Sequence, residues 1–492
     1  MTLPAPDSGF IQARDAMLAL AFIGDLSMGR PTDHSPRTAR LAAWLALASG
    51  GSGADCDAAR CVALLRWSGC TANAAGFESL LGDDVAGRDA LLTLTLPPLA
   101  QREQQRMLPL AEIHCEVSGE IGVMLGMGPQ VVAGLRHIFE RYDGEGMPGE
   151  LDGADVPEVV YRVNLASDLE ILSRAHGVER ALAHVEANAD QRYPRRLTQT
   201  ALREAKRWLA ELDGMDDDLR DGLRDDIRSG DAPTVPLALV GDVIDLKLPW
   251  MAGYSRQAAE LGLAASRAIG LNATAAAAVQ RAALIHGIGR AALPNRLWNT
   301  PGKLHAADWE RVRLMPYWTD RAARRLRGLA GEARLASCAY ERLDGNGYFR
   351  GLSGDMLGQD ARVLAVAIAW TALRARRPWR EAMSAREAAA VLQGEAAKGR
   401  LDPVAVDATI ATACGRSAPI PETVSRASAL LSERETEVLR RISLGESNKE
   451  VARVLAISPS TVRTHMESIF RKLECTTRAA ATLKGFTLGL LQ

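Results

Sequence analysis

The sequence predicts an all-α protein, made of two copies of one helical domain followed by a smaller helical module. Three observations support this fold class. Aromatic residues make up only 5% of the 492 residues, and alanine is abundant. Apolar residues recur at the i, i+3, i+4 spacing of amphipathic helices over most of the chain. Short segments also recur at a nearly constant offset, which indicates an internal duplication.

The duplication is supported by four matching segments. The offset between them is 220 residues at first and falls to about 200, because the first copy carries extra residues between Gly82 and Gln105. Two copies of one domain are therefore predicted, over 10–180 and 237–415. The matches are 25–35 with 245–255, Leu64 and Gly69 with Leu284 and Gly289, 140–146 with 341–347, and Arg162-Val163 with Arg362-Val363.

Three further segments complete the predicted organisation. Residues 181–236 are charged and helix-forming, and we expect them to connect the two copies. Residues 416–428 contain two prolines among polar residues, a composition typical of a linker. Residues 429–492 form the C-terminal module.

Composition favours a cytoplasmic protein with no membrane partner. The net charge is −1, so any affinity for nucleic acid must be local to one part of the chain. Seven cysteines without framework spacing indicate reduced thiols. The N-terminal residues lack the pattern of a signal peptide. The longest apolar run, Val363–Leu373, is too short to span a bilayer.

Capping patterns define four helices in the C-terminal module. Ser-x-x-Glu capping boxes begin at Ser432 and Ser447, and Ser458 before a proline starts a third, longer helix. A fourth helix is expected near Thr476. The third helix has an apolar face made of Val462, Met466, Ile469 and Leu473.

A short helix, a tight turn and a longer helix with a polar outer face form the geometry that places a recognition helix in the major groove. Residues 431–473 (LSERETEVLRRISLGESNKEVARVLAISPSTVRTHMESIFRKL) resemble the LuxR-type (FixJ/NarL-like) four-helix DNA-binding domain. Without this resemblance, the same pattern would also fit a helical bundle that binds no nucleic acid.

The LuxR-type resemblance implies two sets of DNA-binding residues. Arg463, Thr464 and Glu467 would face base edges. Arg463 can donate two hydrogen bonds to a guanine, whereas Glu467 stands where a basic residue is common. The residues expected near phosphates are Lys449, Ser460, Thr461, His465 and Lys472.

The two copies resemble a second family. ALIHGIGRAALPNRLWNTPGKL (283–304), YERLDGNGYFRGL (340–352) and ARVLAVAIAW (361–370) resemble the HD-GYP phosphodiesterase fold. The resemblance covers most of 237–415 and, more weakly, 20–175. It implies a site where histidines and aspartates hold two or more metal ions, and where a metal-bound water attacks phosphorus.

The metal-ligand positions of that family are largely replaced in the second copy. His286 is retained, but the residue after it is Gly287 instead of aspartate. The spacing between positions is unchanged, so we expect the scaffold without its metal chemistry. The other ligand positions hold Tyr254, Met315, Ala339, Tyr340 and Ile368.

The first copy is altered differently. His34, His114 and Asp168 stand at ligand positions, and these three could form a two-histidine, one-carboxylate metal site. The favoured interpretation is that they are buried, hydrogen-bonded residues left over from an ancestor, so no cofactor is expected. The positions that have lost their ligands hold Arg66, Trp67, Ile138 and Phe139.

These observations together predict a DNA-binding transcription regulator that is not an enzyme. Its degenerate HD-GYP-like domains, as pseudo-enzymes, would sense a signal or dimerise. The expected partners are double-stranded DNA and a second copy of the chain, because one module alone would bind weakly. RNA polymerase and a small anionic ligand are further candidate partners.

Two alternatives stay open. The first is a metal-dependent phosphohydrolase that acts on a cyclic dinucleotide and carries a DNA-binding domain. The second is a non-catalytic receptor for a nucleotide or other small ligand, in which Arg290, Arg342 and Arg37 meet an anion. In the simpler interpretation these arginines pair with carboxylates in the core.

Overall fold

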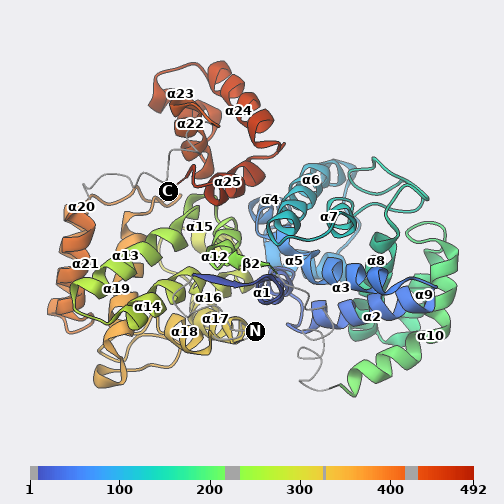
Figure 1. Cartoon of the computed structure of the whole chain (residues 1–492), viewed down its shortest axis with the longest axis horizontal. Coiled ribbons are helices and arrows are strands. Elements are labelled where there is room, and N and C mark those ends of the chain that lie inside the picture. Colours follow the sequence, from blue (N-terminus) through green and yellow to red (C-terminus); the bar gives the residue numbers. More distant parts are fainter. Residues whose placement is uncertain (1–8, 216–232, 325–328, 416–429, 492) are drawn as a thin grey trace. The chain divides into compact units, whose positions relative to one another are not determined.

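The computed structural model is helical almost throughout, as the sequence predicts (Figure 1). It describes residues 9–215, 233–324, 329–415 and 430–491. The linker predicted at 416–428, and part of the connector predicted at 181–236, lie outside these ranges. Two three-residue strands, β1 Phe10–Gln12 and β2 Thr234–Pro236, pair in a two-stranded sheet. The chain divides into two compact units: one runs from Gln12 to Val235, and the other contains Pro236 onward together with the N-terminal residues up to Ile11.

The first unit is built around three helices that pack on one another. Helices α2 His34–Ala48 and α3 Gly53–Leu65 lie side by side, and α8 Glu158–His176 contacts both (Figure 1). A capping box at Ser52 starts α3. The remaining helices are α1 Ala13–Ser27, η1 Ser68–Cys70, α4 Ala74–Leu81, α5 Asp84–Leu92, α6 Gln101–Met124, α7 Pro129–Arg136, α9 Val178–Ala187 and α10 Arg195–Asp213.

The second unit repeats this arrangement at its start. Helices α13 Tyr254–Ala268, α14 Ala273–Ile285 and α19 Gln359–Arg374 contact one another in the same pairwise manner. The other elements of this domain are α12 Ala238–Asp245, η2 Pro249–Met251, η3 Ile288–Ala292, α15 Arg296–Asn299, α16 Ala306–Arg313, α17 Met315–Ala323, α18 Ala330–Ala336, η4 Gly354–Met356, α20 Ala385–Ala397 and α21 Pro403–Gly415.

A buried hydrogen bond occurs at the same register in both copies. The carboxylate of Asp25 accepts from the Ser35 hydroxyl at 2.6 Å, and that of Asp245 accepts from the Ser255 hydroxyl at 2.9 Å. Burial raises the pKa of both Asp25 and Asp245 to about 7. These pairs lie at the offset of 220 residues that the sequence matches define.

The C-terminal module contains the four helices that the capping patterns predict. They are α22 Glu433–Ser443, α23 Asn448–Leu455, α24 Pro459–Leu473 and α25 Arg478–Thr487. Both capping boxes form, and Ser458 caps α24 through the amide of Thr461. The predicted apolar face of α24 is buried. Over the residues that the structure describes, no helix has both the length and the apolar character required to span a bilayer.

Candidate functional site

The outer face of α24 carries the residues expected to meet base edges. Arg463, Thr464 and Glu467 are all exposed on this face. Arg463 Nε donates a hydrogen bond to Glu467 Oε1 at 3.0 Å, one helical turn away. The guanidinium therefore has a competing carboxylate partner on the surface that would face DNA. The base contacts of these three residues stay a prediction.

Of the residues expected near phosphates, Lys472 has a partner inside the module. Its Nζ lies 2.7 Å from Glu435 Oε2, and Ser468 donates to the other oxygen of the same carboxylate at 2.7 Å. Burial opposes ionisation of Glu435, but the hydrogen bonds from Lys472, Ser432 and Ser468 outweigh it and lower the pKa to about 2. Lys472 thus contributes to the packing of α22 on α24, and its phosphate contact stays untested.

The remaining phosphate candidates lie at the surface. Lys449, Ser460 and Thr461 are exposed, and His465 is half-buried. The hydroxyls of Ser460 and Thr461 both contact Ser458 Oγ, at 2.6 and 2.8 Å, at the first turn of α24. Hydroxyls and amides at a helix N-terminus are suited to an anionic group such as phosphate.

In the first domain, the positions that correspond to metal ligands converge around Arg66. The His34 ring, fully buried, contacts Glu170 through Nδ1 and Arg66 through Nε2. Burial is the largest influence on His34 and lowers its pKa to about 4, so the ring is neutral near pH 7. A neutral ring fits both contacts, because Nδ1–H can donate to the carboxylate while Nε2 accepts from the guanidinium.

His114 and Asp168 take part in separate interactions. His114 Nε2 lies 2.6 Å from the carbonyl oxygen of Arg66, and burial lowers the pKa of the ring to about 3. Asp168 accepts a hydrogen bond from the Tyr193 hydroxyl and pairs with Arg192 at 3.0 Å. The structure therefore places His34, His114 and Asp168 in different hydrogen-bond networks.

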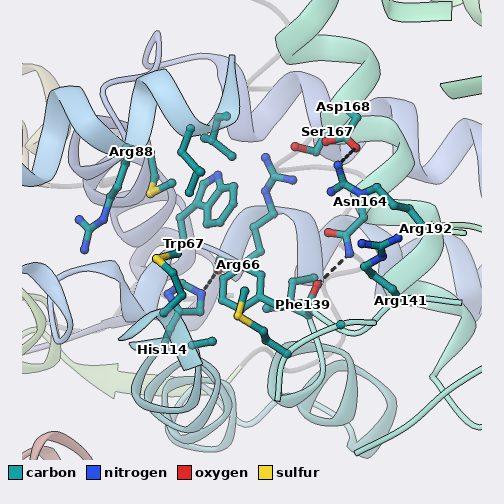
Figure 2. Close-up of a pocket in the computed structure, with 18 of the residues that line it drawn as sticks. Arg66, Trp67, Arg88, His114, Phe139, Arg141, Asn164, Ser167, Asp168 and Arg192 are labelled. Atoms are coloured by element: carbon teal, nitrogen blue, oxygen red, sulfur yellow. Dashed lines mark hydrogen bonds and ion pairs between the residues drawn. The ribbon is translucent and has the colours of Figure 1, made fainter. Parts of the chain in front are cut away.

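A cavity of about 470 Å³ opens beside Arg66 in the first domain. Figure 2 shows the Arg66 side chain between Trp67 and Asn164, with Phe139 and Ser167 on the same cavity. The guanidinium lies over the Trp67 ring at 4.3 Å from its centroid. Arg66 Nε is buried and has no hydrogen-bond partner among the described residues.

In the second domain, Arg290 occupies the centre of the corresponding arrangement. Arg290 donates to His286 Nε2 at 2.8 Å and lies 3.5 Å from Asp245. Tyr254 also lies next to His286, with 5.7 Å between the two ring centroids. The Tyr254 hydroxyl donates a hydrogen bond to the carbonyl oxygen of Ile368 at 3.1 Å. Tyr254, His286 and Ile368, which stand at ligand positions of the HD-GYP family, are therefore neighbours in the structure although they are far apart in the sequence.

The second domain has a larger and more basic cavity of about 860 Å³. Tyr340 and Tyr348 stack on one wall, with centroids 5.3 Å apart and an interplanar angle of 6°. Trp309 meets the Tyr348 ring edge-on at 5.6 Å. Two acidic residues, Glu341 and Glu395, line the cavity, together with six basic residues: Arg290, Lys303, Arg342, Arg377, Arg380 and Arg400.

The arginines named as candidate anion contacts differ in their surroundings. Arg37 pairs with Asp213 at 2.6 Å, and Arg342 pairs with Asp344 at 2.5 Å. Arg290 faces the cavity, and its buried Nη1 has no hydrogen-bond partner among the described residues. Carboxylate pairing, the simpler interpretation, accounts for Arg37 and Arg342. Arg290 and Arg342 both line the cavity, and Arg290 has only a longer carboxylate contact, 3.5 Å to Asp245.

The fit of a metal ion to these sites can be judged from the histidines. Nε2 of His34 and Nε2 of His286 each accept a hydrogen bond from an arginine guanidinium. The guanidinium occupies the lone pair that a metal ion would need, and its positive charge would repel the ion. In the parts of the chain that the structure describes, no three His, Cys, Asp or Glu side chains group closely enough to hold a metal ion. The side chains present therefore do not fit a metal centre at either histidine.

Sequence reasoning missed several residues of both cavities. Glu170, Arg192 and Tyr193 surround the ligand positions of the first domain, and Arg377 and Tyr348 line the second cavity. Glu170 lies two residues after Asp168, so it is on the same helix but outside the family motif. Its pairing with the retained His34 could be found only from the packing of α8 on α2.

Two protein families match separate parts of the chain. The HD domain family matches residues 238–404, and the luxR family of bacterial regulatory proteins matches residues 429–484. The chain is 24% identical over 413 residues to 3'3'-cGAMP-specific phosphodiesterase 3 of Vibrio cholerae, an alignment that covers 77% of this chain and 90% of the relative. That alignment is longer than the stretch from residue 238 to the C-terminus, so it extends into the first copy.

Two further comparisons concern the fold of most of the chain and the C-terminal module. A crystal structure of a cyclic GMP-AMP specific phosphodiesterase from V. cholerae matches with a TM-score of 0.60 and 21% identity, over 83% of this chain and 99% of that chain. This likeness shows the fold. The putative HTH-type transcriptional regulator YhjB of Escherichia coli is 47% identical over 53 residues, which cover 11% of this chain and 26% of the regulator.

One expectation from the sequence is contradicted. We expected the chain not to be an enzyme, because ligand positions are replaced in both copies. The 24% identity over 77% of the chain relates it instead to a phosphodiesterase, and the structural neighbour is of the same kind. Replaced ligands at single positions were too narrow a basis for that conclusion.

Proposed function

We propose that this chain, which carries an HD domain and a LuxR-family domain, is a DNA-binding transcription regulator whose second domain binds a cyclic dinucleotide. The luxR-family match supports DNA binding by α22–α25. The relationship to a 3'3'-cGAMP-specific phosphodiesterase suggests the ligand class. The observation that carries the proposal is the aromatic and basic lining of the larger cavity.

The charge of that cavity suits a cyclic dinucleotide. Six basic side chains face two acidic ones, which leaves an excess of positive charge for the two phosphodiester groups of such a ligand. Arg377 is held over the Trp250 ring at 4.1 Å, and its guanidinium lines the cavity. Arginine pairs well with phosphate oxygens because its planar donors match their geometry.

The aromatic side chains suit the bases of the same ligand. Tyr340 and Tyr348 are already parallel, and Trp309 holds Tyr348 from its edge. Stacking of a base on such a ring contributes about 1–3 kcal/mol and does not depend strongly on which base is present. The volume of about 860 Å³ lies in the range of cavities that enclose ligands of this size.

Calorimetric titration of the full-length protein with 3'3'-cGAMP tests this proposal. We expect saturable binding, and we expect Tyr348→Ala to weaken it about tenfold through lost stacking. Tyr317→Ala is the matched control, because Tyr317 is a half-buried tyrosine that does not line the cavity. Absence of binding, or equal loss in both variants, would contradict the assignment.

Hydrolysis of the bound dinucleotide is a second candidate function. It is favoured by the length of the alignment to the phosphodiesterase. Because the side chains at His34 and His286 do not fit a metal centre, we derive no catalytic step through a metal. Incubation of the protein with 3'3'-cGAMP and Mn²⁺, followed by chromatography, tests this function. A linear dinucleotide product, lost in Tyr348→Ala, would establish it.

The DNA-binding part of the proposal includes dimerisation. A single module buries little surface on DNA, so we expect two copies of the chain to bind two half-sites. Selection of duplexes from a random pool tests this. Enrichment of inverted repeats with a fixed spacing would support a dimer, and enrichment of single half-sites would contradict it. Contact with RNA polymerase would follow promoter binding and stays a prediction.

A further inference from the structure

We propose that the cavity of the first domain is a second ligand site, which takes a small planar aromatic molecule carrying one negative charge, such as an aromatic carboxylate. This proposal does not rest on dinucleotide binding by the second domain. It rests on Arg66, on the aromatic side chains beside it and on the charge balance of the cavity (Figure 2).

Arg66 supplies the anion contact. Its side chain is among the largest fully buried ones, with 1% of its surface exposed. It donates one hydrogen bond, to His34, and its buried Nε has no hydrogen-bond partner in the described part of the chain. A guanidinium has five N–H donors, and a buried donor without a partner costs free energy. A carboxylate in the cavity would supply the missing acceptor.

The other three arginines of the cavity already have acceptors. Arg88 donates to the carbonyl of Cys70 at 2.9 Å and to Asn73 at 2.6 Å. Arg192 pairs with Asp168 at 3.0 Å, and Arg141 pairs with Asp143 at 2.5 Å. Arg66 and Arg141 of this lining each have a buried Nε without a hydrogen-bond partner among the described residues, but Arg141 already forms an ion pair with Asp143. Arg66 is therefore the arginine left for a ligand.

The charge of the lining limits the ligand to one negative charge. Arg66, Arg88, Arg141 and Arg192 are balanced in part by Glu140, Glu145 and Asp168. The larger cavity of the second domain has six basic and two acidic residues. A dianion in the first cavity would face three carboxylates with only one uncommitted guanidinium, so a monoanion is favoured.

The walls of the cavity favour a flat aromatic ring. Trp67, His114 and Phe139 form an aromatic cluster, in which the Trp67 and Phe139 rings are 6.3 Å apart and the His114 and Phe139 rings are 4.8 Å apart. Aliphatic side chains complete the lining, including Leu91, Leu92 and Leu172. Aromatic rings pack well against such a wall, in offset or edge-on geometry.

Fluorescence titration of the full-length protein with 2-naphthoate tests the proposal, with 2-naphthamide as the neutral probe of equal shape and 2-naphthyl phosphate as the dianion. We expect 2-naphthoate to bind at least about tenfold more tightly than the amide, since a hydrogen bond to a charged group is lost in the amide. We also expect it to bind more tightly than the phosphate. Equal binding of 2-naphthoate and the amide, or stronger binding of the phosphate, would overturn the proposal.

Two variants locate the site. Arg66→Met keeps the aliphatic part of the side chain and should abolish the preference for 2-naphthoate over the amide. Arg290→Met is the matched control, since Arg290 is an equally buried arginine beside a histidine in the second domain. If Arg290→Met removes the preference while Arg66→Met keeps it, the ligand lies in the second domain and the proposal fails.

A further variant covers the case in which Arg66→Met does not fold. Phe139→Leu leaves the Arg66 guanidinium in place and replaces a half-buried aromatic ring of the cavity with a smaller aliphatic side chain. We expect it to weaken 2-naphthoate binding about fivefold through lost ring contact. Unchanged affinity in this variant would overturn the placement of the ring.

Discussion

In the second domain, a guanidinium nitrogen of Arg290 lies 2.8 Å from Nε2 of His286. The other ring nitrogen, Nδ1, lies 2.6 Å from the carbonyl oxygen of Ala283. A neutral imidazole satisfies both contacts, because Nδ1–H donates to the carbonyl and Nε2 accepts from the arginine. The first domain contains the same device, in which Arg66 contacts Nε2 of His34. An arginine and a neutral histidine thus occupy the centre of both copies.

The buried, neutral state of His286 makes the stability of the second domain depend on pH. Burial, and then the charge of Arg290, lower the pKa of His286 from 6.5 to about 3. Between these two values the unfolded chain binds more protons, so stability falls as the pH falls through this window. Relative to His286→Gln, wild type should lose about 2 kcal/mol between pH 7 and pH 5, measured by urea unfolding.

The control for this measurement is the exposed His305, changed to glutamine. The difference in the free energy of unfolding between wild type and His305→Gln should be the same at pH 7 and pH 5. If the difference in the free energy of unfolding between wild type and His286→Gln is also the same at both pH values, the His286 ring is not held neutral by its surroundings.

Arg463 is expected to carry sequence preference in DNA binding. Its side chain lies on the exposed face of α24, where a bidentate contact to guanine is within the reach of a recognition helix. Arg463→Ala should weaken specific binding by about 1–3 kcal/mol and relax the preference at one base pair. Binding to the duplex selected from the random pool gives this value. Arg440→Ala, on α22, is the control and should leave the preference unchanged.

Glu467 should restrain the same arginine. It accepts a hydrogen bond from Arg463 Nε at 3.0 Å and would bring a negative charge close to phosphates. Glu467→Gln removes this charge and frees the guanidinium. We expect tighter binding to duplexes of any sequence, and a salt dependence steeper by about one phosphate contact. Glu437→Gln, on α22, should change neither quantity. Weaker binding of Glu467→Gln would instead indicate that Glu467 accepts from a cytosine amine.

Local patterns explain why the C-terminal module could be predicted closely from the sequence. Ser432 and Ser447 form the two expected capping boxes, and Ser458 caps α24. Each of these interactions lies within four residues along the chain, so the sequence contains both partners in one short segment. The partner of Lys472, in contrast, is Glu435 on another helix. The sequence does not reveal that contact, so Lys472 was expected near a phosphate from its position in the family motif alone.

The same distinction holds for the two larger domains. The offset of 220 residues aligns Asp25 and Ser35 with Asp245 and Ser255, and the structure forms the same hydrogen bond in both copies. The centre of each domain could not be predicted, because Arg66 and Arg290 come from different positions of the repeat and yet place a guanidinium on a histidine. Such convergence depends on how the helices pack, and position-by-position matching cannot detect it.

Lys472 allows a structural role to be separated from a role in DNA binding. Its ammonium, with Ser432 and Ser468, holds the pKa of Glu435 at about 2 despite burial. Because that pKa is lowered from 4.5, the stabilisation is present above pH 4.5 and is lost as the pH falls toward 2.

Lys472→Met should therefore increase hydrogen exchange in α22 and α24 at pH 7, by an amount equivalent to about 1 kcal/mol. Lys449→Met, on the surface of α23, should not. If Lys472→Met leaves exchange unchanged and weakens binding to all duplexes equally, phosphate contact is its main role.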